Sequence, residues 1–98
     1  MPFKFRILIV DDQSFNIEAL KIILQYCIGI DTNKFCKSAL SGQQALQMVT
    51  SDLEESKING GTMESSFNLI LMDLNMPGMD GNTTMVKIRE YLHFNGVN

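Results

Sequence analysis

The chain changes its hydrophobic period where its first strand ends, near residue 11. Residues 7–10 (Ile-Leu-Ile-Val) close a strand predicted over residues 4–10. An unbroken apolar run is typical of a strand that is covered on both faces, as in a parallel sheet. The apolar residues between Ser14 and Cys27 instead follow a helical period and share one face: Ile17, Leu20, Leu24 and Cys27. We therefore expect a helix that has Ser14 as its N-cap and ends at Gly29.

A second strand–helix pair follows with a weaker signal. Residues 33–39 predict a short strand with one polar face, as an edge strand has. Residues 43–53 predict a helix whose buried side carries Ala45, Leu46, Val49 and Leu53. Residues 52–66 then lose all periodicity, although connections in α/β domains usually have only about 2–6 residues. We interpret residues 52–66 as a flexible surface insertion, with an extension of the helix into its start as the alternative.

The third strand–helix pair has the clearest pattern. Residues 67–72 predict a buried strand that ends at Asp73, and residues 83–92 predict a helix whose core-facing residues are Met85, Ile88 and Leu92. Three such units in succession predict an α/β fold, a doubly wound parallel sheet with helices on both faces and right-handed crossovers. The length of 98 residues suits a single domain over 1–98.

Composition narrows the classes of protein to which the chain can belong. Lys and Arg number 8 against 11 Asp and Glu, and the net charge of −3 provides no cationic surface for nucleic acid. No apolar run approaches the ~18 residues of a membrane span, and the N-terminus lacks the apolar core of a signal peptide. We therefore expect an intracellular protein without nucleic-acid or membrane contacts. Cys27 and Cys36 lie in apolar stretches, and we interpret both as small buried hydrophobic residues.

Carboxylates follow two of the predicted strands. Asp11 and Asp12 come directly after the first strand, and Asp73 follows the third. In an open α/β sheet, ligands bind outside the carboxyl ends of the strands. If these two strands are neighbours, the three carboxylates converge there and repel one another unless a cation neutralises them. A compact set of oxygen ligands suits Mg²⁺, so the sequence predicts a magnesium site; the alternative is that the aspartates are solvated turn formers.

The residues around these aspartates resemble a known family. Ile7 to Asp12, together with residues 69–81 (Leu-Ile-Leu-Met-Asp-Leu-Asn-Met-Pro-Gly-Met-Asp-Gly), is similar to the receiver domain of two-component response regulators. That family has an acidic pair after its first strand and an Asp-x-x-Met-Pro-x-Met-Asp-Gly signature after its third. Residues 12–16 (Asp-Gln-Ser-Phe-Asn) look most like receivers of hybrid histidine kinases. The resemblance implies a flavodoxin-like (CheY-like) sheet with the strand order 2-1-3-4-5.

The resemblance also implies a role for each residue of the site. Asp73 would be the phosphoacceptor, which takes a phosphoryl group from a phosphohistidine. Asp11 and Asp12 would hold Mg²⁺ together with Asp73 and the backbone carbonyl of Asn75. The metal would offset the repulsion between the anionic nucleophile and the phosphoryl oxygens.

Two residues of the signature would have mechanical roles by the same resemblance. Pro77 would fix φ, and Gly81 would allow a turn before the next helix. The implied partner is a histidine kinase or a histidine phosphotransfer protein. The chain would then be a cytoplasmic signalling domain, or the cytosolic part of a larger membrane-bound hybrid kinase, with at most slow self-dephosphorylation and no other enzyme activity.

The family's fold extends beyond the last predicted helix. A receiver has five strands, so we expect a receiver that is truncated after its third helix and lacks the strand-4 Ser/Thr and strand-5 Lys of the family. Truncation leaves a second function open, that of a non-switching or decoy receiver that only binds partners. It also leaves the outer edge of the strand at 67–72 unpaired, and from this edge we expect self-association.

An enzyme of another class uses a similar nucleophile. Haloacid-dehalogenase-like phosphatases have an Mg²⁺-bound aspartate at a strand end and a second aspartate two residues later. Here that second position is Asn75, and the signature of those enzymes would lie on the first strand. The receiver is therefore the favoured interpretation.

Overall fold

The strand β1 (Ile7–Val10) lies at the centre of the fold because both of its faces are apolar. In the computed structural model, which describes residues 6–58 and 67–96, each of its four residues is at most 1% exposed. Ile7 and Ile9 face one side of the sheet, where they pack with Ile17 and Leu24. Leu8 and Val10 face the other side, in a cluster that also contains Ala39, Ala45, Val49, Met76 and Ile88. The one apolar run thus packs against helices on both faces of the sheet. The predicted strand residues 4 and 5 lie outside the described residues.

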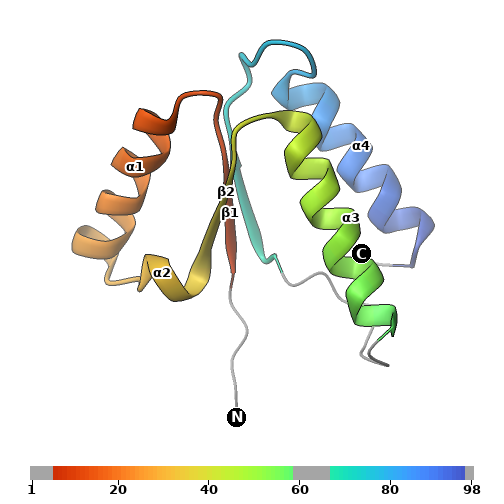
Figure 1. Cartoon of the computed structure of the whole chain (residues 1–98), viewed down its shortest axis with the longest axis horizontal. Helices are drawn as coiled ribbons and strands as arrows, with labels where there is room; N and C mark the ends of the chain where they lie inside the picture. Colours follow the sequence, from red (N-terminus) through yellow and green to blue (C-terminus); the bar gives the residue numbers. More distant parts are fainter. Residues whose placement is uncertain (1–5, 59–66, 97–98) are drawn as a thin grey trace.

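Two parallel strands, β2 (Cys36–Ala39) and β3 (Leu69–Met72), flank β1 in the order β2-β1-β3. Ile7 pairs with Cys36 on one side and with Leu69 on the other, so all three strands end at the same level. Figure 1 shows α1 (Ser14–Ile23) on one face of the sheet and both α3 (Gly42–Ile58) and α4 (Gly81–Phe94) on the other. The predicted doubly wound parallel sheet is confirmed.

The first helix departs from its prediction at its N-cap and in the form of its last turns. Gln13 and not Ser14 is the N-cap residue of α1, and its side chain makes no capping hydrogen bond. The helix continues as a π-helical segment, η1 (Leu24–Ile28), which ends as predicted at Gly29, where φ is 85°. Because a π-helix closes i→i+5 hydrogen bonds and has a wider turn, Cys27 rotates out of the buried stripe and is exposed. The prediction of a buried Cys27 was wrong, and Cys36 is only half-buried.

A short helix precedes β2, where a longer strand was predicted. The helix α2 (Thr32–Phe35) starts after Asp31, whose side chain accepts a hydrogen bond from the N–H of Asn33 at 3.2 Å. This capped turn keeps the residues up to Phe35 out of the sheet, so the predicted strand start at residue 33 was wrong. β2 is an edge strand, as predicted, and Lys37 on it is exposed.

The helix α3 is longer than the predicted 43–53. Its first turn is fixed by two hydrogen bonds: the N–H of Gln44 donates to Ser41 Oγ at 3.0 Å, and Gln44 Oε1 accepts from the N–H of Leu40 at 2.8 Å. Its buried side matches the prediction, with Ala45, Val49 and Leu53 buried and Leu46 half-buried. Residues 52–58, the start of the predicted insertion, are helical, which is the alternative in which the helix extends into that segment. The remainder of that predicted insertion, 59–66, lies outside the described residues.

The last two elements are less buried than predicted. Leu69 is exposed and the other residues of β3 are half-buried, because among the described residues β3 pairs with β1 alone. The helix α4 buries Gly81, Thr84 and Ile88, whereas Met85 is 37% exposed. The predictions of a buried third strand and of a core-facing Met85 were therefore wrong. None of the described helices is long and apolar enough to cross a membrane.

Candidate metal centre

The ends of β1 and β3 bring three carboxylates together. Val10 and Met72 are partners in the sheet, so Asp11 and Asp73 follow at the same level of neighbouring strands. The N–H of Asp73 donates to the carbonyl of Val10 at 2.9 Å, which fixes this juxtaposition. One carboxylate oxygen from each of Asp11, Asp12 and Asp73 lies within 4.8 Å of the others. The predicted convergence of the three side chains is therefore present.

Local hydrogen bonds orient two of these carboxylates. Asp11 is 8% exposed, and its Oδ1 accepts from the N–H of Gln13 at 2.9 Å and from Asn16 Nδ2 at 3.4 Å. Asp73 Oδ1 accepts from the N–H of Asn75 at 3.1 Å. Asn16 was not among the predicted site residues. The sequence could have indicated Asn16, because it is an amide side chain in the first turn of the helix that follows Asp11 and Asp12.

The loop after Asp73 owes its shape to two glycines with different roles. Gly78, which follows the exposed Pro77, has a φ of 79°, a conformation that favours glycine. Gly81 has no such φ, so the space around it and not its backbone conformation calls for a glycine. A Cβ at Gly81 would lie 2.8 Å from Leu74 Cα and even closer to the carbonyl oxygen of Asp73. Gly81 is required there because the start of α4 packs directly on the backbone beside Asp73.

Asp80 caps the helix that closes this loop. Its side chain is the N-cap of α4, and its Oδ1 accepts from the N–H of Thr83 at 2.8 Å. The backbone hydrogen bond from Thr83, which favours the charged form, holds the pKa of Asp80 below its ordinary value. The cap thereby fixes where the loop ends and α4 begins.

The donor set of the cluster fits a hard divalent cation. Three carboxylates this close repel one another, and a cation between them removes that repulsion. Their oxygens are the ligands that Mg²⁺ prefers, and Asp12 and Asp73 are half-buried and so open to solvent. A cavity of about 350 Å³ lies beside them, lined by Val10, Asp11, Leu20, Leu71, Met72 and Asp73. The cluster is therefore accessible to an incoming reactant.

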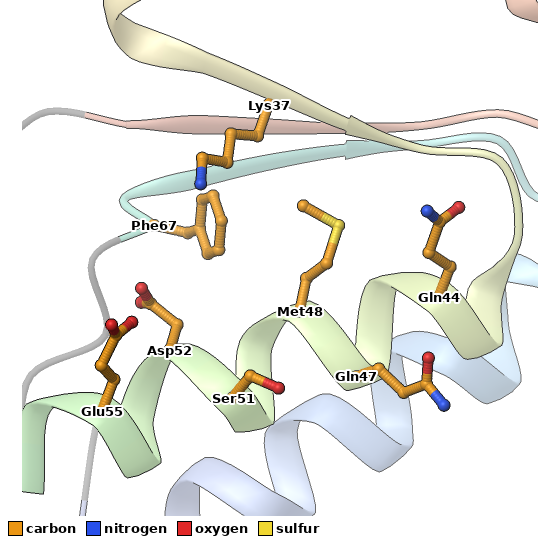
Figure 2. Close-up of a pocket in the computed structure, with 8 residues that line it drawn as sticks. All are labelled: Lys37, Gln44, Gln47, Met48, Ser51, Asp52, Glu55 and Phe67. Carbon is orange, nitrogen blue, oxygen red and sulfur yellow. The ribbon is translucent and has the colours of Figure 1, made fainter. Parts of the chain in front are cut away.

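A second cavity lies away from the carboxylates, between β2 and α3. Figure 2 shows its lining, which comes from one side of α3, from Lys37 on β2 and from Phe67. Its volume is about 390 Å³. The guanidinium of Arg6 lies 5.1 Å from the centre of the Phe67 ring and pairs with Asp52 at 3.8 Å. None of the residues that line this cavity belongs to the carboxylate cluster.

Comparison with known proteins relates the chain to signalling proteins. Over 85 residues it is 36% identical to the hybrid signal transduction histidine kinase L of Dictyostelium discoideum, and this match covers 87% of the chain and 4% of that kinase. The receiver domain of the Arabidopsis thaliana histidine kinase CKI1, solved in complex with Mg²⁺, is 30% identical, with a TM-score of 0.83. The same receiver has been solved with Mg²⁺ and BeF₃⁻, with a TM-score of 0.82.

These matches cover nearly all of this chain but a smaller share of the solved receivers. The two CKI1 matches cover 95% of this chain but only 61% and 60% of the CKI1 receiver chains. A CheY-like receiver of Methanospirillum hungatei is 29% identical, covering 91% of this chain and 56% of that one, with a TM-score of 0.58. Residues 7–94 match the response regulator receiver domain family. The chain therefore belongs to the family of response regulator receiver domains.

Proposed function

We propose that this chain is the phosphoacceptor receiver of a histidine-kinase phosphorelay and that Asp73 is the residue that accepts the phosphoryl group. The observation that carries the proposal is the position of Asp73, within 4.8 Å of Asp11 and Asp12 at the open end of a parallel sheet, in a chain of the receiver family. The 350 Å³ cavity beside Asp73 gives a phosphodonor access to the carboxylate.

The proposed reaction transfers a phosphoryl group from a histidine nitrogen to a carboxylate oxygen of Asp73. An oxygen of Asp73 attacks the phosphorus of a phosphohistidine, a new O–P bond forms, and the N–P bond breaks. The imidazole leaves with the electron pair of that bond and takes up a proton. The hydrogen bond from the Asn75 N–H to Asp73 Oδ1 holds one oxygen and leaves Oδ2 as the attacking atom.

The cation site requires Asp11, Asp12 and Asp73, with the backbone carbonyl of Asn75 as a further ligand. When bound, Mg²⁺ neutralises charge on the carboxylates and on the phosphoryl oxygens. The CKI1 receiver solved with Mg²⁺ supports this assignment through its likeness to this chain. The orienting bonds from Gln13 and Asn16 keep the Asp11 side chain in place for this task.

The docking surface of the phosphodonor would be the exposed apolar face of α1 and η1. Phe15, Ile22 and Tyr26 are 79%, 58% and 77% exposed and recur at helical spacing. Phe15 lies in the first turn of α1, three residues after Asp12 of the carboxylate cluster. A partner that brings a phosphohistidine to Asp73 must cover this end of the sheet, and an apolar helix surface around its histidine would match the face.

The chain would act within a larger signalling protein. The Dictyostelium match is to a hybrid histidine kinase, of which the chain corresponds to 4%. We propose that the partner is a histidine kinase or a histidine phosphotransfer protein and that the domain works in the cytoplasm. A non-switching receiver that only binds its partner is the second candidate function. The chain spans about 60% of the solved receivers that it matches.

Phosphorylation from a small donor separates the two candidates. The chain is incubated with acetyl phosphate and Mg²⁺, and phosphoprotein is separated by phosphate-affinity electrophoresis. We expect a hydroxylamine-sensitive phosphoprotein in the wild type and none in Asp73→Asn. No labelling of a folded wild-type chain would contradict the phosphoacceptor role and support the binding-only receiver.

Transfer from a protein donor tests the docking surface. The donor is a histidine phosphotransfer protein that carries phosphohistidine. We expect Phe15→Ala to slow this transfer at least about tenfold, as loss of a central apolar contact does, and to leave labelling by acetyl phosphate unchanged. The matched control is Phe94→Ala, which removes another exposed ring, 90% exposed at the end of α4, and should affect neither reaction. Equal rates for both variants with the protein donor would contradict the docking surface.

A further inference from the structure

The N-terminus of α3 and the first turn of α4 meet at a contact between Gly42 and Thr84. Gly42 is the first residue of α3 and is buried, and Thr84 is 0% exposed. A Cβ at Gly42 would lie 2.8 Å from the Met79 carbonyl oxygen, 3.2 Å from Thr84 Cβ and closer still to Thr84 Oγ1. Residue 42 therefore has no room for a side chain unless Thr84 or the backbone at Met79 moves.

Thr84 also holds the end of the loop that follows Asp73. Its Oγ1–H donates to the carbonyl of Asp80 at 2.7 Å, and the Met79 carbonyl lies 3.5 Å from the same oxygen. At the other end of the contact, α3 starts three residues after Ala39, whose carbonyl accepts from the N–H of Asp11 at 3.1 Å. The contact thus joins the backbone beside Asp11 to the far end of the Asp73 loop.

Gly81 closes the same loop at a second point. Its N–H donates to the carbonyl of Leu74 at 3.3 Å, and its Cα packs on the backbone of Asp73. Residues 74–80 are therefore held at their start by Gly81 and at their end by Thr84 against Gly42. Asn75 lies between these two points.

We propose that Gly42 and Thr84 are positioning residues for the metal centre: their contact fixes the loop of residues 74–80, and with it the Asn75 carbonyl, against the start of α3. This inference rests on the proposed function, in which that carbonyl is a ligand. Neither residue touches the cation. Each acts by setting the distance between the loop and the carboxylates, and outer contacts of this kind influence metal affinity.

The test compares Mg²⁺ affinity with stability in four chains: wild type, Gly42→Ala, Gly42→Ala/Thr84→Ala and Leu53→Val. Mg²⁺ is titrated while the backbone amides of residues 11–12 and 73–80 are followed by NMR, and urea unfolding gives the stability of each chain. Leu53→Val is the matched control, because Leu53 is a 0% exposed residue of the same helix, 11 residues from Gly42. It lies outside the core cluster that contains Met76 of the loop, so the variant loses stability at a distance from the loop.

We expect Gly42→Ala to bind Mg²⁺ about tenfold more weakly or worse and Leu53→Val to bind it like the wild type. Gly42→Ala/Thr84→Ala removes the atom nearest the new methyl, but it also loses the hydroxyl bond to Asp80 and keeps the Met79 carbonyl 2.8 Å from the methyl, so its affinity should stay below that of the wild type. Wild-type affinity in Gly42→Ala, or an equal loss in Leu53→Val, would overturn the proposal.

Two further measurements distinguish a failure of this inference from a failure of the proposed function. Wild-type binding that survives Asp12→Ala would refute the metal centre itself. The metal-free amide shifts of residues 74–80 then still test the contact, because Gly42→Ala must move them and Leu53→Val must not. If Gly42→Ala does not fold, Thr84→Val replaces it in the test. This variant keeps the side-chain volume and removes the hydroxyl bond to Asp80, so it must move the same amides and weaken Mg²⁺ binding. Unchanged amide shifts and unchanged affinity would overturn the proposal.

Discussion

Gly81 lies against the backbone of Asp73 so closely that no side chain fits between them. A Cβ at residue 81 would lie 2.8 Å from Leu74 Cα, and the carbonyl oxygen of Asp73 would be nearer still. The glycine that begins α4 is thus part of the geometry of the candidate phosphoacceptor, because any shift of the helix moves the strand end that carries the carboxylate.

Gly81→Ala should therefore reduce both stability and phosphorylation. Overpacking at a tight backbone contact costs about 1–3 kcal/mol, and urea unfolding measures this loss. Labelling by acetyl phosphate should also fall, since the Asp73 backbone must move to admit the methyl group. Asn82→Ala changes an exposed neighbour in the same turn and should leave both quantities near their wild-type values. Wild-type stability in Gly81→Ala would contradict the close contact.

Mg²⁺ binding should depend on the three clustered carboxylates and not on an exposed acidic side chain of α4. Asp12→Ala removes one of three oxygens that lie within 4.8 Å of one another, and we expect Mg²⁺ binding to be lost. Glu90→Ala removes an exposed carboxylate from α4 and should have no effect. NMR titration measures both, and an equal loss of affinity in the two variants would point to nonspecific binding.

The N-cap of α4 should make the stability depend on pH in the acidic range. The pKa of Asp80 in the folded chain is lowered from 3.8 by the hydrogen bond from Thr83. The unfolded chain therefore binds the proton more tightly, so this contribution is fully present above the unfolded pKa and is lost as the pH falls through the folded pKa. Asp80→Asn keeps a capping oxygen but cannot titrate, so its unfolding free energy should fall less between about pH 5 and pH 2 than that of the wild type. An identical pH dependence would contradict the cap.

The free edge of β3 should make the 98-residue chain self-associate. Among the described residues β3 is bonded to β1 only, and an unpaired apolar edge is a template for another chain. Leu69 on this strand is 42% exposed, so Leu69→Lys adds a charge to the edge and should lower the average mass measured by light scattering. Val86→Lys adds the same charge on α4, where Val86 is 55% exposed, and should not. A monodisperse wild-type monomer would contradict this prediction.

The sequence alone was sufficient to predict the sheet and the convergence of the aspartates. The run Ile7–Val10 requires cover on both faces, and a strand of that kind is central in a parallel sheet. Carboxyl ends of neighbouring parallel strands meet at one edge, so Asp11, Asp12 and Asp73 had to lie together once β1 and β3 were adjacent. The parallel sheet follows from periodicity and chain direction, whereas the convergence also needs β1 and β3 to be neighbours, which the family resemblance implied and the strand order β2-β1-β3 shows.

The tertiary structure decided which side chains are buried and why the glycines are needed. Periodicity places Met85 and Cys27 on apolar stripes, yet packing against α3 buries Thr84 instead of Met85, and the π-turn of η1 exposes Cys27. A sequence pattern gives the angular position of a residue on an ideal helix, but the rotation of the helix and its local pitch are set by the neighbours it meets. The contacts of Gly42 with Thr84 and of Gly81 with Asp73 join segments about 42 and 8 residues apart, and only the folded chain brings those backbones within reach of each other.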